Sequence, residues 1–212
     1  MNFIPSLHWR YSVKKFDFRK KLSKRKLQKV LTAVNLSASS YGMQPYKIVV
    51  VSDDAEVRKE LRFQSFNQPQ ITDASHLLIF AIRTDINKNY VEDMVKYIEK
   101  KRGLMHGTLD GYKTTVIKNI DTLSTVDKVS WATNQAYIAL GTLITYCAFE
   151  KIDTCPMEGF SREGFEKILN FTDKNLKPTV LAAIGYRAID DSYRLMKKVR
   201  KPLSEMVFQN KF

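Results

Sequence analysis

Cysteine is scarce in this sequence of 212 residues, which contains only Cys147 and Cys155. Their spacing fits neither a CxxC redox pair nor a four-ligand zinc site, so we expect reduced thiols in a cytosolic protein. Glycine totals only 8, and no glycine-rich linker, internal repeat or low-complexity tract occurs. We therefore expect a single domain over residues 1–212, which excludes a disordered, fibrous or disulfide-stapled chain.

The motifs of the familiar catalytic sites are missing as well. The sequence contains no GxSxG, Walker A or GxGxxG pattern, and His8, His76 and His106 are too scattered for a metal-binding helix. We expect no metal site, and we interpret His76, just before an apolar run, as a hydrogen-bonded structural residue. Without a protein nucleophile, a bound organic cofactor would have to supply any difficult chemistry.

The N-terminal residues 1–20 lack the uninterrupted apolar stretch of a secretory signal. A run without formal charge covers residues 129–149 and has the ~20 residues that a transmembrane helix needs. It contains too many Ser, Thr, Asn and Gln side chains for burial in lipid. We interpret it as a long buried helix at the centre of the domain or of a dimer interface, and we expect no membrane partner.

Negative charge is under-represented, because 35 Lys and Arg residues face 22 Asp and Glu residues and leave a net charge of +13. This excess indicates an anionic partner without identifying it. Arg10, Ser12 and Lys14 alternate, so an extended segment would place all three on one side. A second basic cluster near the C-terminus consists of Lys197, Lys198, Arg200 and Lys201. If the two clusters met they would form a phosphate clamp; the alternative for each is a solvated basic surface.

Helices and strands alternate along the chain, which predicts a layered α+β or α/β sheet. Apolar and β-branched runs predict strands at residues 46–51, 77–82, 152–157 and 179–185. Helical patterns begin after Ser23 and Ser161, both plausible N-caps, and cover residues 54–63 and 91–101 as well. Residues 84–125 have a weaker pattern, which we interpret as a mobile excursion with helical pieces. The segment beyond Pro202 has too little apolar content to stand alone.

Two polar segments next to predicted strands could contact a ligand. Residues 156–160, Pro-Met-Glu-Gly-Phe, form a turn between a strand and a capped helix, where backbone N–H groups and a glycine allow close approach. Asn67 and Gln70 lie in a proline-containing stretch, and their amides could hydrogen-bond the edge of a planar heterocycle. An ordinary connection and a surface loop are the respective alternatives.

Six short motifs occur in a fixed order along nearly the whole chain. They are residues 10–16 (RYSVKKF), Ser39-Ser40 through Gln44-Pro45-Tyr46, Phe66-Asn67 through His76, Trp131 with Gln135, residues 156–160, and Lys198-Val199-Arg200 before Pro202. In this order and spacing the chain resembles the FMN-dependent nitroreductase family, specifically the oxygen-insensitive NAD(P)H nitroreductases and their dihydropteridine reductase relatives.

The resemblance implies roles for individual residues. Arg10 and Ser12 would bind the FMN phosphate, together with Lys198 and Arg200. Lys14 would reach the pyrimidine side of the flavin, where a cation stabilises negative charge; Asn67 would hydrogen-bond the same edge, and the main chain at Glu158 and Gly159 would donate toward flavin N5. The complete set expected at the cofactor is Arg10, Tyr11, Ser12, Lys14, Ser39, Ser40, Asn67, Gln70, Met157, Glu158, Gly159, Lys198 and Arg200. Of these, Lys14, Asn67 and Gln70 would also face the substrate or NAD(P)H.

Members of this family are homodimers with two flavins at the interface. The resemblance therefore implies that Ser39 and Ser40 contact the FMN held mainly by the partner subunit. The helix over residues 129–149 would form the interface core, and residues 203–212 would be an arm on the partner. We expect the excursion at residues 84–125 to be the lid that selects substrates.

Three positions depart from the family pattern. Gln70 stands where close relatives carry a second lysine beside the flavin, which predicts a weaker positive field and a lower reduction potential. Tyr11 replaces a histidine, and Tyr41-Gly42-Met43 follows the paired serines. These departures are compatible with FMN binding and leave the substrate preference open.

We therefore expect an α+β homodimer with a central, mostly antiparallel sheet flanked by helices. It would take hydride from NADH or NADPH onto FMN N5 and then reduce nitroaromatics, quinones or other flat electron-poor acceptors in a ping-pong cycle. No side chain need act as a nucleophile. A flavin reductase or a dehalogenating relative is the alternative among enzymes. A basic nucleic-acid-binding module is the alternative outside them, but no RNP, zinc-finger or helix-turn-helix signature supports it, and we expect no nucleic acid partner.

Overall fold

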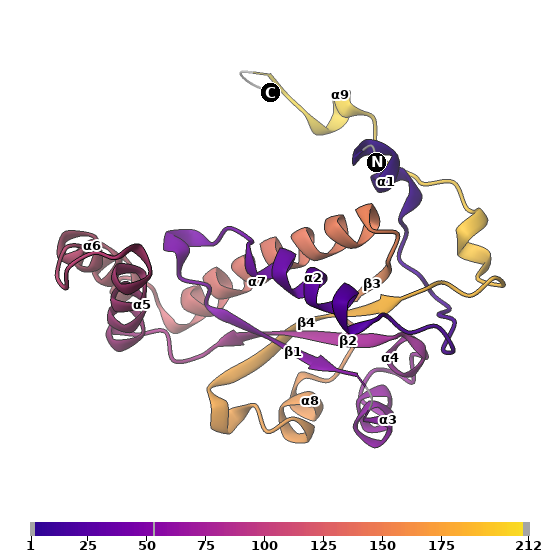
Figure 1. Ribbon diagram of the computed structural model, residues 1–212, viewed down its shortest axis with the longest axis horizontal. Helices are drawn as coiled ribbons and strands as arrows, with labels where there is room; N and C mark the ends of the chain where they lie inside the picture. Colours follow the sequence, from indigo (N-terminus) through magenta and orange to yellow (C-terminus); the bar gives the residue numbers. More distant parts are fainter. Residues whose placement is uncertain (1–2, 53, 210–212) are drawn as a thin grey trace.

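A single antiparallel sheet organises the fold (Figure 1). A computed structural model describes residues 3–52 and 54–209. Within these residues the strand order is β1-β2-β4-β3, and every neighbouring pair is antiparallel. The strands cover Tyr46–Val51 (β1), His76–Arg83 (β2), Asp153–Met157 (β3) and Leu176–Gly185 (β4). Each strand overlaps an apolar run that predicted it, and the α+β class with an antiparallel sheet is confirmed.

Helices cover both faces and one end of the sheet. In Figure 1, α2 (Lys24–Asn35) and α7 (Thr125–Phe149) lie above the sheet, whereas α3 (Ala55–Phe63), α4 (Gln70–Asp73) and α8 (Arg162–Ile168) lie below it. At one end lie α5 (Lys88–Arg102) and α6 (Asp110–Asp121). The short elements are α1 (Phe3–Trp9), α9 (Leu203–Met206) and the 3₁₀ turns η1 (Ser40–Gly42), η2 (Thr172–Lys174) and η3 (Ser192–Leu195).

Side-chain caps fix where two of the predicted helices begin. Ser23 accepts a hydrogen bond from Lys26 N at 3.3 Å at the start of α2. Ser161 accepts one from Gly164 N at 3.0 Å at the start of α8. Each cap satisfies a backbone N–H that the first helical turn leaves unpaired. The two N-caps predicted from the sequence are therefore confirmed.

The central strands separate two hydrophobic cores. Leu78, Phe80 and Ile184 point toward the α2–α7 side, whereas Ile79 and Leu181 point toward the α3–α8 side. Alternate residues of a strand face opposite sides, so β2 and β4 are buried on both faces. This double burial explains why their sequences read as continuous apolar runs instead of alternating with polar residues.

Helix α7 is the long helix that the uncharged run predicted, and it begins four residues earlier than that run. Ala136, Ala139 and Leu143 pack in the core, whereas Tyr137 and Ile138 on the other side are 37% and 46% exposed. The helix is thus buried along one face within a single chain. Within residues 3–52 and 54–209, no helix is long and apolar enough to cross a membrane.

The excursion at residues 84–125 is more regular than the sequence pattern predicts. Asn87 caps α5, and Gly103 ends it in the left-handed conformation at φ 65°, which glycine adopts without strain. Val95 of α5 and Ile120 of α6 are buried in the same core. The weak pattern results from narrow apolar faces on otherwise charged helices.

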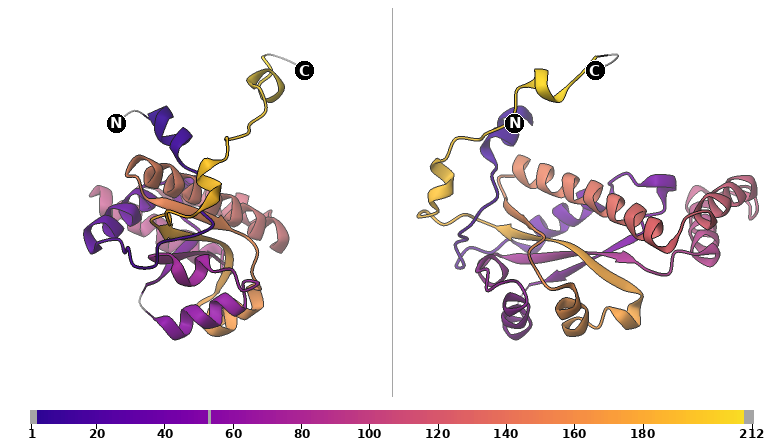
Figure 2. Two further views of the ribbon diagram at one scale, coloured as in Figure 1. Left: turned by 90° about the vertical axis from the view of Figure 1, so that its right-hand side faces the viewer. Right: turned by 180° about the vertical axis from the view of Figure 1, so that it is seen from behind.

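The C-terminal segment leaves the sheet after β4 and runs past α1, so the two ends of the described chain lie on the same side of the molecule (Figures 1 and 2). Leu203 is 78% exposed and Met206 is 62% exposed. Of the predicted arm at residues 203–212, the last three residues lie outside the described part of the chain. Helix α1 has no counterpart among the sequence predictions, because seven residues are too few for a helical apolar pattern to be distinguished from chance.

Candidate functional site

A basic pocket lies between the two ends of the chain and has a volume of about 340 Å³. We call it the basic pocket; its lining residues are His8, Trp9, Arg10, Tyr11, Ser12, Lys14, Tyr193, Arg194, Met196, Lys197, Lys198 and Arg200. The structure thus brings together the two basic clusters that are more than 180 residues apart in the sequence. Both clusters face one cavity, except for Lys201, which lies outside the lining and pairs with Glu205.

Residues 10–14 enter the basic pocket because this segment is extended along β3. Ser12 forms a parallel bridge with Thr154, and Val13 N donates to Thr154 O at 3.1 Å. Val13 is completely buried. Since alternate side chains of an extended segment face opposite ways, burial of Val13 leaves Ser12 and Lys14 on the pocket side.

The C-terminal part of the basic pocket is tied directly to the N-terminal part. Lys198 Nζ donates to Leu7 O at 2.6 Å and also to Arg10 O. The Arg187 guanidinium lies 4.2 Å from the Trp9 ring centroid and 4.5 Å from that of Tyr11. Arg187 also donates to Asp153 Oδ1 at 2.5 Å, which links this stack to β3. The stack holds the residues after β4 against the N-terminal segment.

The cations of the basic pocket repel one another. Burial lowers the pKa of Arg10, and the like charge of Arg200 lowers it further. The pKa of Lys198 is lowered by burial and then by Arg10 and Arg200. Arg10 Nε is buried and has no hydrogen-bond partner in the described part of the chain. A group of like charges with an unsatisfied donor is a site that an anion with several acceptor oxygens would stabilise.

A second group of predicted residues surrounds the turn after β3. Gln68 Nε2 donates to Gly159 O at 2.9 Å, which places the Asn67 segment beside this turn. A Cβ atom at Gly159 would lie 3.3 Å from Gln68 Nε2. Tyr137 of α7 donates to Glu158 Oε1 at 2.5 Å, and burial together with this bond raises the pKa of Tyr137 to about 12. Met157 is buried in the core and anchors the turn.

Asn67 and Gln70 differ in their surroundings. Asn67 is exposed and has a left-handed backbone at φ 56°. Gln70 does not lie in an exposed loop: it begins α4 and is only 6% exposed. Pro69 at φ −66° favours this helix start, and the burial of Ile71 holds the turn inward. Gln70 Oε1 is buried without a hydrogen-bond partner among the described residues.

Ser39 and Ser40 lie elsewhere. Their segment, between α2 and β1, sits at the α5–α6 end of the molecule, away from the C-terminal segment (Figure 1). Ser40 N donates to Gln135 Oε1 at 2.7 Å, and Ser39 Oγ accepts from Gln44 N at 3.0 Å. Tyr112 of α6 donates to Tyr41 O at 2.6 Å, which connects this segment to α6. A single chain therefore does not bring the paired serines to the basic pocket.

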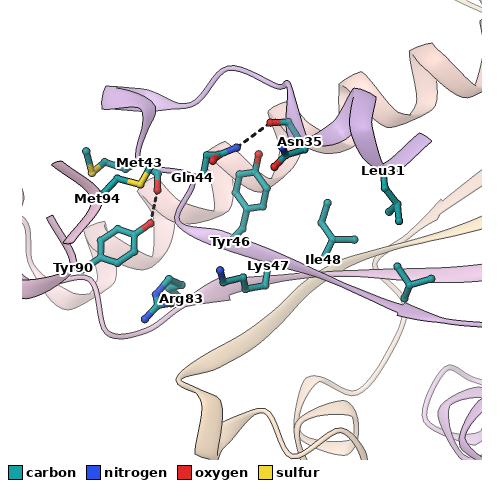
Figure 3. Close-up of a pocket in the computed structure, with 11 residues that line it drawn as sticks. Leu31, Asn35, Met43, Gln44, Tyr46, Lys47, Ile48, Arg83, Tyr90 and Met94 are labelled. Atoms are coloured by element: carbon teal, nitrogen blue, oxygen red, sulfur yellow. Dashed lines mark hydrogen bonds between the residues drawn. The ribbon is translucent and has the colours of Figure 1, made fainter. Parts of the chain in front are cut away.

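Another cavity, of about 420 Å³, lies between α2, β1 and α5 (Figure 3). Gln44 reaches across it to Asn35 O at 3.0 Å, and Tyr90 donates to Met43 O. Its floor is formed by Ile48 and other residues of β1, which pairs with β2 on one side only. None of the residues that the sequence predicts at a ligand lines this cavity.

Comparison with known proteins decides the family. The model of the nitroreductase family matches residues 7–186. A protein of Staphylococcus saprophyticus, provisionally named an NAD(P)H nitroreductase, is 30% identical over 96% of this chain and 94% of its own length. The chain belongs to the nitroreductase family. The expectation of a nitroreductase-type oxidoreductase enzyme is confirmed.

Solved structures show the same nitroreductase fold. A protein of Staphylococcus epidermidis, provisionally named an NAD(P)H:FMN oxidoreductase, superposes with a TM-score of 0.86 at 23% identity, covering 98% of this chain and 95% of that chain. A protein of Exiguobacterium sibiricum, provisionally named a nitroreductase and solved in complex with FMN, gives a TM-score of 0.85 at 19% identity, covering 99% of this chain and 98% of that chain. These likenesses establish the fold over nearly the full length of both chains.

The residues of the nitroreductase chain fit a phosphate-bearing cofactor such as FMN. The basic pocket offers several cations, the Ser12 hydroxyl and the unsatisfied Arg10 Nε, which match the charge and acceptor oxygens of a phosphate monoester. Thr154 lies beside the basic pocket, and the turn at Glu158 comes four residues later, just after the end of β3. Four residues of a strand span on the order of 13 Å, which is the separation between the pocket and the turn. A phosphate and a ring joined by a chain could span it.

Sequence reasoning missed several residues of the basic pocket. Trp9 and Tyr193 supply aromatic walls, and Lys14 Nζ lies 5.9 Å from the Tyr193 ring centroid. Arg194 is a further cation that lies outside the basic cluster recognised in the sequence. No spacing signal could reveal these residues, because α1 and η3 meet only in the folded chain.

Proposed function

We propose that this chain is an FMN-dependent NAD(P)H oxidoreductase that reduces flat, electron-poor acceptors such as nitroaromatics and quinones in a ping-pong cycle. The observation that carries the proposal is the basic pocket. In it, repelling cations from both ends of the chain surround the buried Arg10 Nε, which has no hydrogen-bond partner among the described residues. Bound FMN would supply the atom that accepts and donates hydride, flavin N5. The protein supplies binding, orientation and electrostatics.

The residues of the pocket divide this work. Arg10, Ser12, Lys198 and Arg200 bind the phosphate, while Tyr11 supports the segment that carries Ser12. Lys14 keeps a positive charge near the pyrimidine edge of the flavin, where it would stabilise the negative charge of the reduced ring. Asn67 and Gln70 provide amides toward that edge. Gln70 Oε1 is buried and has no hydrogen-bond partner in the part of the chain that the structure describes, which supports a role for Gln70. The turn at Met157, Glu158 and Gly159 orients the ring through its main chain.

We also propose a homodimer in which Ser39 and Ser40 contact the flavin of the partner subunit. Their position far from the basic pocket supports a role at a second site. The exposed face of α7, with Ile138, provides an apolar surface for the interface. The exposed arm beginning at Leu203 would lie on the partner, and the cavity beside the open edge of β1 offers apolar residues to receive it. Helices α5 and α6 would act as the lid over the acceptor.

Purified protein tests the proposal directly. We expect a yellow protein with flavin absorption that NADH or NADPH bleaches under anaerobic conditions, and whose colour returns on titration with a quinone or a nitroaromatic. Rates with free flavins and halogenated aromatics on the same preparation would reveal a flavin reductase or a dehalogenating enzyme instead. A colourless protein that takes up no FMN and is inert toward NAD(P)H would refute the proposal.

A further inference from the structure

Asp191 lies at the junction between the two halves of the basic pocket. It is only 2% exposed and immediately precedes η3. Its Oδ2 atom accepts hydrogen bonds from Tyr11 Oη at 3.0 Å, Lys14 N at 3.0 Å and Lys15 N at 3.3 Å. Its Oδ1 atom accepts from Tyr193 N at 3.1 Å. One carboxylate thus binds the N-terminal segment and the start of the C-terminal segment at the same time.

These four bonds control the direction of both cationic segments. The bonds to the main chain of Lys14 and Lys15 hold the end of the extended segment whose side chains enter the basic pocket. The bond to Tyr193 caps the turn that leads to Lys198 and Arg200. Ala188 N also donates to Lys15 O at 2.9 Å, so the contact between the two segments is continuous on this side.

A carboxylate near a phosphate site would ordinarily oppose anion binding. The main-chain N–H groups and the hydroxyl that face the Asp191 oxygens offset part of its negative charge. Among the described residues it forms no salt bridge, whereas the neighbouring Asp190 pairs with Lys15. Burial, and after it the bond to Asp191, raises the pKa of Tyr11, so the hydroxyl stays protonated and remains a donor to the carboxylate. Asp191 therefore stabilises geometry without neutralising the cations.

We propose that Asp191 is a positioning residue that holds the N-terminal and C-terminal halves of the basic pocket in register for a phosphate monoester. Tyr11, the departure from the family pattern, is its side-chain partner in this role. The inference rests on the proposed function, because the phosphate in question is that of FMN. It predicts a larger effect on binding of the phosphate, which both segments face, than on binding of the flavin ring, which of the two segments only Lys14 would face.

The test compares Asp191→Asn with Asp190→Asn, an adjacent exposed aspartate of equal charge. Dissociation constants for FMN and for riboflavin, which lacks the phosphate, are measured by quenching of flavin fluorescence. We expect Asp191→Asn to weaken FMN binding about tenfold, as for the loss of one charged hydrogen-bond acceptor, and riboflavin binding less than about twofold. Asp190→Asn should change both constants by less than about twofold.

Tyr11→Phe provides a milder second variant should Asp191→Asn fold poorly. It removes one donor and leaves the main-chain bonds, so FMN binding should weaken by about two- to fivefold with riboflavin binding unchanged. Equal effects of the Asp191 and Asp190 variants, or equal losses for FMN and riboflavin, would overturn the inference and leave the proposed function standing. If the wild-type protein bound neither flavin, the proposed function would fail, and the inference with it.

Discussion

Replacement of Arg200 by alanine separates binding of the phosphate from stability of the fold. Arg200 is exposed, and within residues 3–52 and 54–209 its side chain donates one hydrogen bond, from Nη1 to the neighbouring Val199 O at 2.6 Å. Its positive charge lowers the pKa of Arg10 and of Lys198, so it is unfavourable to the free pocket. Its removal should therefore leave the free energy of unfolding of the flavin-free protein unchanged, or raise it slightly.

The same change should weaken FMN binding, because one charge-assisted contact to the phosphate is lost. Such a contact is worth about 1.5–3 kcal/mol, which corresponds to a dissociation constant that rises about 10- to 150-fold. Lys101→Ala is the matched control: Lys101 is exposed, lies over the ring of Tyr97 at 5.6 Å and is remote from the pocket. It should change binding by less than about 0.5 kcal/mol.

The assay is titration of flavin-free protein with FMN and with riboflavin at two salt concentrations, together with urea unfolding. Arg200→Ala should reduce the salt dependence of FMN binding, since one cation fewer faces the phosphate. Riboflavin binding should not change. Equal effects of Arg200→Ala and Lys101→Ala on FMN, or a similar loss for riboflavin, would refute the assignment of this side chain to the phosphate.

Three further predictions concern the fold that supports the site. Arg58 is buried and donates to the carbonyls of Ile71 at 2.7 Å and Ala74 at 2.8 Å. Arg58→Met should therefore lower the free energy of unfolding in urea by at least about 3 kcal/mol. The neighbouring exposed variant Lys59→Met should lower it by less than about 0.5 kcal/mol. A Cβ atom at Gly185 would lie 2.9 Å from Ser75 N, so Gly185→Ala should lower the free energy of unfolding by about 1–3 kcal/mol. At Gly111 of α6 a Cβ atom would meet open space, so Gly111→Ala should raise the free energy of unfolding by up to about 1 kcal/mol. Leu109 N donates a hydrogen bond to Glu99 of α5, which holds the start of α6 against α5 and lowers the pKa of Glu99. The stabilisation from this bond is fully present above the pKa of Glu99 in the unfolded chain, about 4.3. It is lost as the pH falls through the lower pKa of the folded chain. Hydrogen-exchange protection of α6 should therefore fall with acid in the wild type and be nearly independent of pH in Glu99→Gln; the same acid response in both would contradict this origin.

Local sequence signals predicted the strands and capped helices because each depends on nearby residues. The continuous apolar run of β4 requires only that both faces be covered, and the Ser161 cap requires only the next three residues. The helix predicted at residues 91–101 is confirmed as α5, whereas the weak pattern after Gly103 did not predict the regular helix α6. The narrow apolar face of α6 is recognised only in the folded chain, where Ile120 is buried in the same core as Val95 of α5.

The sequence by itself determined the strands, the capped helices, the excess of positive charge and the family motifs, because each depends only on residue types or on residues close together in the sequence. Only the tertiary structure decided that Arg10 and Arg200 face one cavity, that Asp191 joins the segments carrying them, and that Gln70 is buried instead of exposed. The physical reason is that β3 holds the N-terminal segment while β4 delivers the C-terminal segment to the same edge of the sheet. The spacing of residues along the chain does not predict that these two segments lie side by side.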